Sequence, residues 1–206
     1  MLFYDAPDPA PNPRRVRLFA AAKGIDLPMR SLSIVGGEHK APEFTAKYPP
    51  GQLPILELDD GTILGESIAI CRYLDALHPD PPLFGRTPLD IGRIDMAIRR
   101  VEFTLMTPVG MVWMHTHPFT ARVVKPQYSE FGESNRPRAE AAMRQIDRTL
   151  ADNADRGELW LAGAAFSMAD IVLVTTLDFA AFIGLAEPAD TPALKAWRGR
   201  IDQRLA

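Results

Sequence analysis

The chain has 206 residues, of which 47% are hydrophobic and 24% charged, and its formal net charge is −3. This composition is typical of a globular protein, excludes a largely disordered chain, and lacks the basic excess of a dedicated nucleic-acid binder. A single cysteine, Cys71, excludes an intrachain disulfide and a cysteine-cluster metal site. Because no apolar run is long enough to cross a membrane and no secretory signal is visible, we expect a cytoplasmic protein.

The first 80 residues alternate between strand and helix patterns. Short apolar runs bounded by turn residues predict strands at 2–4, 30–35, 54–58 and 62–64. Apolar residues at helical spacing predict helices at 14–23 and 67–77, and Gly24 is expected to end the first in the left-handed conformation. Asp60-Gly61 predicts a tight hairpin turn. This order predicts an α/β domain with a four-stranded sheet of mixed direction.

A proline-rich segment, residues 79–88, interrupts the chain after the last of these helices. Proline removes backbone donors and restricts its predecessor, so this segment is a candidate linker. We therefore expect domains at residues 1–80 and 88–206, with residues 81–87 joining them.

The second part carries only helical patterns. Apolar periodicity predicts helices at 91–112 and 138–151. Ser167 and Asp170 have the spacing of a capping box, which predicts a helix start of structural rather than chemical importance. Thr191-Pro192 predicts the start of a last helix. The second domain is therefore expected to be all-α.

Three short motifs in the first part permit both a structural and a functional interpretation. Pro54, after Gln52-Leu53, opens a strand, or its peptide bond is cis and leaves the Leu53 backbone free to pair with a peptide ligand. Ser67 caps a helix, or its helix start binds a carboxylate while Glu66 binds an ammonium group. The pair His39-Lys40 is a solvated loop, or it holds a second carboxylate.

Together these motifs resemble the cytosolic glutathione S-transferase family of bacterial type. The matching stretches are Asn-Pro-Arg-Arg-Val-Arg at 12–17, Gly-Glu-His-Lys-Ala-Pro-Glu-Phe at 37–44, Pro-Gly-Gln-Leu-Pro at 50–54, Gly-Glu-Ser-Ile-Ala-Ile at 65–70 and Ser-Met-Ala-Asp at 167–170. They span the chain in the family's order. The resemblance implies a thioredoxin-like glutathione-binding domain followed by an all-helical domain, a homodimer, and no metal.

The resemblance also implies roles for individual residues. The γ-glutamyl end of glutathione would sit on Glu66 and Ser67, and its cysteinyl backbone would pair with Leu53 before a cis Pro54. Its glycine carboxylate would meet the side chains of His39, Lys40 and Gln52. The sulfur would lie near residues 10–13, at the start of the first helix.

The chain departs from the family at the position that usually activates the thiol. Alignment on the Arg-Val-Arg motif places Ala10, which has no side-chain donor, where many members have serine. Tyr4 lies on the first strand and is expected in the core. Asn12 can donate to sulfur beside the positive end of the helix, and some disulfide-reducing relatives have a similar Thr-Pro-Asn loop. Asn12 is thus the candidate catalytic residue, with a helix-capping role as the alternative.

Other candidates have a structural alternative. Cys71 lies on an apolar helical stripe and is expected to be buried. His115 and His117 would point about 200° apart on a helix and so would not share a metal ion. The resemblance implies an acceptor pocket formed by Met111, Trp113 and Met114, although these side chains are equally suited to a core.

The resemblance therefore predicts a transferase that activates the glutathione thiol and adds it to a hydrophobic electrophile, a detoxification chemistry. One alternative is a glutathione-dependent disulfide reductase or isomerase. Another, which Ala10 keeps open, is a non-catalytic ligand-binding or scaffold protein with the same fold.

Overall fold

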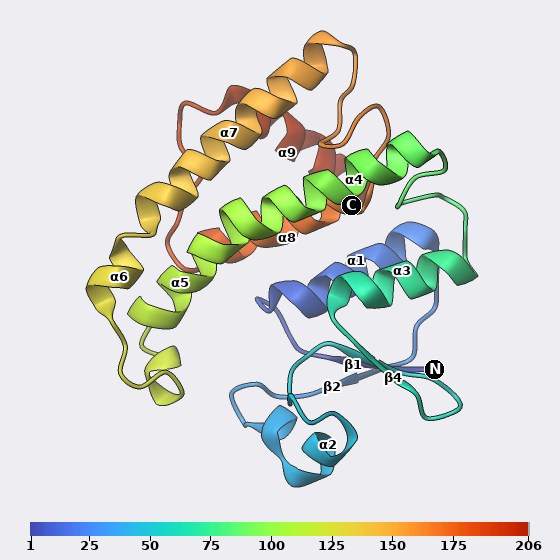
Figure 1. Ribbon diagram of the computed structural model, residues 1–206, viewed down its shortest axis with the longest axis vertical. Helices are drawn as coiled ribbons and strands as arrows, with labels where there is room; N and C mark the ends of the chain where they lie inside the picture. Colours follow the sequence, from blue (N-terminus) through green and yellow to red (C-terminus); the bar gives the residue numbers. More distant parts are fainter. Residues whose placement is uncertain (206) are drawn as a thin grey trace. The chain divides into compact units, whose positions relative to one another are not determined.

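The computed structural model describes residues 1–205, which form two compact units, Met1–Leu83 and a second beginning at Phe84. The first contains a sheet covered by helices and the second is helical (Figure 1). Within the described chain, no helix is long and apolar enough to span a membrane. The domain limits 1–80 and 88–206 remain a prediction.

The sheet of the first unit has four strands in the order β2-β1-β3-β4. Their bounds are β1 Leu2–Asp5, β2 Met29–Ser31, β3 Ile55–Glu57 and β4 Ile63–Gly65. β1 runs parallel to β2 and antiparallel to β3, and β3 and β4 form a hairpin whose turn contains Gly61 at φ 84°. The predicted mixed sheet is confirmed. β2 ends earlier than predicted because the Ser33 N–H donates to Glu38 Oε2 at 2.6 Å and turns the chain.

Two helices, α1 (Pro11–Lys23) and α3 (Ser67–Leu77), cover one face of this sheet (Figure 1). Gly24 ends α1 at φ 65°, as predicted. The other face carries the 3-10 turn η1 (Glu38–Lys40) and α2 (Pro42–Lys47). Sequence periodicity misses α2 because its six residues are too few to show a repeat.

Apolar side chains from the sheet, α1 and α3 form the core of the first unit. Its fully buried members include Phe3, Val16, Phe19, Ile55, Leu56, Ile70, Cys71 and Leu74. Burial raises the pKa of the Cys71 thiol, so this cysteine is a core residue, as predicted, rather than a nucleophile. Tyr4 is likewise buried, in a cluster with Leu32, Phe44 and Ile55.

The second unit begins with a long helical run that contains one irregular turn. Its segments are α4 Pro88–Arg100, the π-helix η2 Val101–Met106 and α5 Thr107–Thr116. Sequence analysis predicts a single regular helix here. Thr104 and Thr107 hydroxyls donate to the Arg100 and Glu102 carbonyl oxygens at 2.6 and 3.0 Å, which provides partners for carbonyls around the irregular turn. The remaining elements are η3 Thr120–Arg122, α6 Ser129–Glu133, α7 Arg136–Asp155, α8 Met168–Phe182 and α9 Pro192–Leu205.

The start of α8 is organised around Asp170, which is 0% exposed. Its Oδ2 accepts the Ser167 N–H at 3.0 Å, as predicted for a capping box. Its Oδ1 accepts the Leu161 N–H at 2.9 Å and the Trp197 indole N–H at 2.8 Å. Burial raises the pKa of Asp170, and these hydrogen bonds oppose that shift. The carboxylate thus joins three segments of the helical unit.

Candidate functional site

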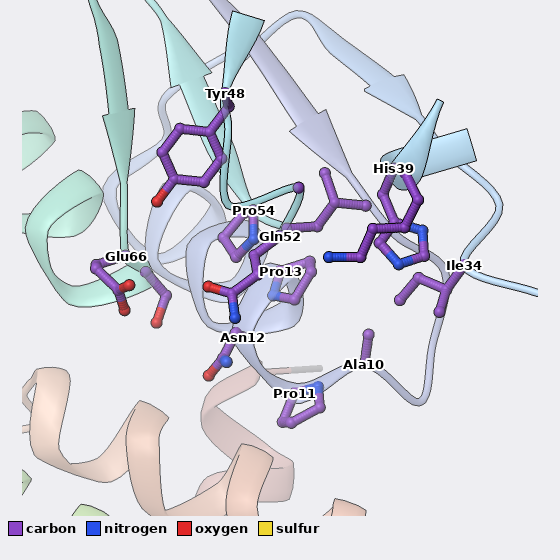
Figure 2. A pocket seen from close by; sticks show the side chains of 14 residues that line it. Ala10, Pro11, Asn12, Pro13, Ile34, His39, Tyr48, Gln52, Pro54 and Glu66 are labelled. Carbon is purple, nitrogen blue, oxygen red and sulfur yellow. The ribbon is translucent and has the colours of Figure 1, made fainter. Parts of the chain in front are cut away.

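A cavity of about 530 Å³ opens in the first unit (Figure 2). Nine of its lining residues were singled out from the sequence, namely Ala10, Asn12, His39, Lys40, Gln52, Leu53, Pro54, Glu66 and Ser67. Pro11, Pro13, Ile34, Tyr48 and Gly51 complete the lining. Glu66 and His39 lie on opposite sides, with Asn12 and Gln52 between them (Figure 2). The fold thus gathers residues that are up to 57 positions apart in the chain.

The N-terminus of α3 forms one side of the cavity. Its N-cap is Glu66, which has φ 63° and makes no side-chain capping bond. A positive φ is uncommon for a residue with a side chain and marks a constrained position. The alternative that Ser67 caps the helix is wrong, because Ser67 is its first helical residue. The first helical N–H groups have no partner within a helix, so this end is suited to a carboxylate.

The opposite side of the cavity carries a cation and an imidazole. Lys40 is exposed, and its Nζ donates to the Pro50 carbonyl oxygen at 3.0 Å. His39 Nδ1 is buried without a hydrogen-bond partner in the described chain. Burial, assisted by the Lys40 charge, lowers the pKa of His39. Lys40 therefore carries the positive charge here, while His39 favours the neutral form.

The floor between these sides is formed by the loop that leads into β3. The Leu53–Pro54 peptide bond is cis, as anticipated. Gly51 has φ 56°, and a Cβ on it would lie 2.9 Å from the His39 carbonyl oxygen. A larger residue is therefore excluded where this loop approaches η1.

The start of α1 forms the remaining side. Ala10 is the N-cap and contributes no side-chain bond, whereas Asn12 is the second helical residue. The alternative that Asn12 caps α1 is therefore wrong. Arg17 holds the preceding loop, since its Nη1 donates to Asp5 Oδ1 at 2.5 Å and to the Ala6 carbonyl oxygen at 2.9 Å. This loop is thus fixed by contacts outside the cavity lining.

Two lining residues, Ile34 and Tyr48, were missed from the sequence. Tyr48 follows α2, which has no periodic signal. The fold fits Tyr48 closely against β4, because a Cβ on Gly65 would lie 2.2 Å from the Tyr48 hydroxyl oxygen. The sequence signal for this contact is the strand glycine Gly65, because a glycine in a strand often marks the close approach of another group.

The predicted acceptor residues Met111, Trp113 and Met114 lie on α5 in the second unit. The Trp113 ring centroid lies 5.4 Å from that of Phe179 and 5.8 Å from that of Phe119. These aromatic contacts explain how Trp113 is packed, and the acceptor role remains a prediction.

The two histidines of this region accept different hydrogen bonds. His115 Nδ1 accepts the Tyr128 N–H at 3.3 Å, and His117 Nδ1 accepts the Phe119 N–H at 3.2 Å. Across residues 1–205, no group of three or more His, Cys, Asp or Glu side chains is arranged to hold a metal ion.

Comparison with known proteins places this geometry in a family. Residues 4–82 match the family model for the glutathione S-transferase N-terminal domain, and residues 111–204 match that for its C-terminal domain. Glutathione S-transferase 2 of Saccharomyces cerevisiae is 40% identical over 207 residues, covering 99% of this chain and 86% of the yeast protein.

Solved structures agree with the sequence matches. A crystal structure of Gtt2 from Saccharomyces cerevisiae superposes with a TM-score of 0.89 at 40% identity, covering 98% of this chain and 96% of that one. A glutathione S-transferase domain-containing protein of Marinobacter aquaeolei gives 0.91 at 35% identity, with 99% and 98% coverage. The chain belongs to the glutathione S-transferase family and has its fold, a thioredoxin-like α/β domain followed by an all-α domain.

Proposed function

We propose that the protein binds reduced glutathione in the cavity of the first unit and transfers its thiol to a hydrophobic electrophile. The observation that carries the proposal is the cavity itself. It joins a helix N-terminus and a carboxylate on one side to a lysine and a neutral histidine on the other. Such a site is complementary to a peptide with an amino-acid group at one end and a carboxylate at the other.

In the proposed complex, the γ-glutamyl carboxylate accepts hydrogen bonds at the start of α3, and Glu66 binds the ammonium group. The cysteinyl backbone pairs with Leu53. The glycine carboxylate is neutralised by Lys40 and accepts further hydrogen bonds from His39 and Gln52. Each charged group of the tripeptide thereby meets an opposite charge or a helix dipole.

The thiol is proposed to lie at the start of α1, where Asn12 supplies an amide donor. A free cysteine thiol has a pKa of about 8.5, and each unit of lowering requires about 1.4 kcal/mol in favour of the thiolate. A helix dipole contributes about 0.3–1 kcal/mol, and a hydrogen bond to a charged group about 1.5–3 kcal/mol. Together they account for a lowering of the thiol pKa by about one to three units without a serine or tyrosine.

The remaining parts of the proposal rest on family membership. Met111, Trp113 and Met114 are proposed to contact the electrophile. The protein is proposed to act in the cytoplasm as a homodimer. Disulfide exchange would use the same thiolate and differs only in the electrophilic partner.

A second candidate, glutathione binding without catalysis, is favoured by one observation. The α1 N-cap is alanine, and both Pro11 and Pro13 in its first turn lack an N–H. The thiolate would therefore depend on Asn12 for both its side-chain and backbone donors in this turn.

The test combines binding, thiol ionisation and turnover. Calorimetry measures glutathione affinity, and ultraviolet absorbance follows the thiolate of bound glutathione against pH, with S-methylglutathione as the control that binds without ionising. Binding, a lowered thiol pKa and conjugation of a model aryl halide support the proposal. Binding with an unshifted pKa supports the second candidate, and a failure to bind glutathione overturns both.

A further inference from the structure

The short helix α2 contributes no side chain to the cavity, yet it connects two segments that line it. η1 precedes α2 and supplies His39 and Lys40. The chain that leaves α2 supplies Tyr48, Gly51 and Gln52. Any displacement of α2 relative to the sheet therefore moves two walls of the cavity.

This helix cannot hold itself in place. It has six residues, and an isolated helix of that length is unstable in water. Its N-cap, Ala41, makes no side-chain capping bond, and Phe44 is its only buried residue. The position of α2 must therefore come from its contacts with the sheet.

Those contacts form a compact group. The Phe44 and Tyr4 rings pack in an edge-to-face arrangement, with centroids 5.8 Å apart. Lys47 Nζ donates to Glu57 Oε2 at 2.5 Å and to the Tyr4 hydroxyl oxygen at 2.8 Å. The Tyr4 hydroxyl in turn donates to Glu57 Oε2 at 2.8 Å. Because Tyr4 is on β1 and Glu57 is on β3, Lys47 connects the end of α2 to two neighbouring strands.

The network favours the charged forms of Lys47 and Glu57. The hydrogen bond with Glu57, and then that with Tyr4, raise the pKa of Lys47. The hydrogen bond from Lys47 is the largest cause that lowers the pKa of Glu57. The two side chains are 32% and 25% exposed, so the ion pair is partly shielded from solvent.

We propose that Lys47 is a positioning residue of the glutathione site, which holds α2 on the sheet so that both flanking walls are preformed. This inference rests on the proposed function. Lys47, Tyr4 and Glu57 do not line the cavity, so their effect on the ligand passes through α2. The starts of α1 and α3 lie outside the segment that α2 moves, and Arg17 fixes the loop before α1 separately. Thiol ionisation should therefore be insensitive to Lys47.

The principal variant is Lys47→Met, which keeps the aliphatic stem and removes the charge. We expect the glutathione Kd and KM to rise about three- to tenfold, the scale of one ordinary hydrogen bond, because the loss reaches the ligand only through α2. We expect kcat at saturating glutathione and the pKa of the bound thiol to stay unchanged. Lys47→Arg should restore most of the affinity, and Lys195→Met, at an exposed position on α9, is the matched control.

A second variant, Glu57→Gln, separates positioning from simple electrostatics. It makes the first unit more positive, so long-range attraction predicts tighter binding of an anionic peptide. The proposal predicts weaker binding, because the ion pair that anchors Lys47 is lost. Tighter or unchanged binding in Glu57→Gln overturns the proposal.

Hydrogen exchange of the amides of residues 43–48 in the ligand-free protein tests the anchor without glutathione. Faster exchange in Lys47→Met together with a raised Kd supports the proposal. Faster exchange with an unchanged Kd, or a Kd increase accompanied by a shifted thiol pKa, overturns the positioning role. If the wild-type protein binds no glutathione, the proposed function falls as well, whereas wild-type binding with unaltered variants removes only this inference.

Discussion

Two helices begin at the same cavity with different first turns. α3 starts with Ser67-Ile68-Ala69, each of which has an N–H, next to the carboxylate of Glu66. α1 starts with Pro11-Asn12-Pro13 after an alanine N-cap, so only Asn12 has an N–H in that turn. The start of α3 thus offers several backbone donors, whereas the start of α1 offers the donors of Asn12 alone.

Under the proposed function, this difference separates two tasks, with the start of α3 binding the ligand and the start of α1 activating its thiol. The start of α3 is equipped to bind a carboxylate, which needs several donors. In the proposed complex, the start of α1 has only to favour a thiolate over a thiol, a task assigned to the Asn12 amide and the helix dipole. A third helix, α8, differs from both, because its own Asp170 accepts the N–H of the N-cap residue Ser167.

The largest effect on stability is expected at the start of α8, where the buried carboxylate of Asp170 accepts several hydrogen bonds. Asp170→Ala leaves the Leu161 N–H and the Trp197 indole N–H buried without partners, each costing about 1–3 kcal/mol. We expect the free energy of unfolding to fall by about 3 kcal/mol or more in urea titrations. Asp152→Ala, at an exposed carboxylate on α7, should change it little. A stable but inactive Asp170 variant would instead indicate a catalytic acid.

The next effect concerns the donor-rich start of α3. Glu66→Ala removes the proposed partner of the ligand's ammonium group and should weaken glutathione binding by about 1.5–3 kcal/mol, measured by calorimetry. Asp26→Ala, at another exposed carboxylate of the same unit, controls for net charge. An unchanged Kd in Glu66→Ala would remove this side of the cavity from the ligand site.

A smaller effect is expected at the donor-poor start of α1. Asn12→Ala should raise the pKa of the bound thiol by about one unit and lower turnover, with little change in Kd, because the amide favours only the ionised sulfur. Thiolate absorbance against pH reports this directly. Asn12→Asp should be more harmful, since a carboxylate repels a thiolate. Normal turnover in Asn12→Asp would leave activation to the backbone and helix dipole alone.

The smallest effect is a pH dependence of stability from His39. Burial and Lys40 lower its pKa from 6.5 in the folded state, so the unfolded chain binds more protons below that pH. The stability of the ligand-free protein should therefore rise with pH through the window below 6.5 and fall on acidification. His39→Gln should flatten this slope in denaturant titrations at several pH values. If the pH dependence of stability is the same in His39→Gln, then His39 has the same pKa in the folded and unfolded states.

Several features of the protein follow from local sequence. The Asp60-Gly61 turn, the Gly24 stop and the helix over 67–77 are specified by neighbouring residues, and the fold reproduces them. The candidate site is predicted less by residue spacing than by five motifs that resemble one family. Long helices and tight turns can be predicted from the sequence because the residues that cause them lie within a few positions of one another.

The tertiary structure decided what local sequence left open. The N-caps are Ala10 and Glu66 rather than Asn12 and Ser67. The path of the preceding loop determines which residue is the last with non-helical dihedral angles. The position of the short helix α2 is set by side chains outside it, because Tyr4 packs against Phe44 and both Tyr4 and Glu57 accept hydrogen bonds from Lys47. Such contacts depend on which strands become neighbours, and that is a property of the packed fold rather than of any local window.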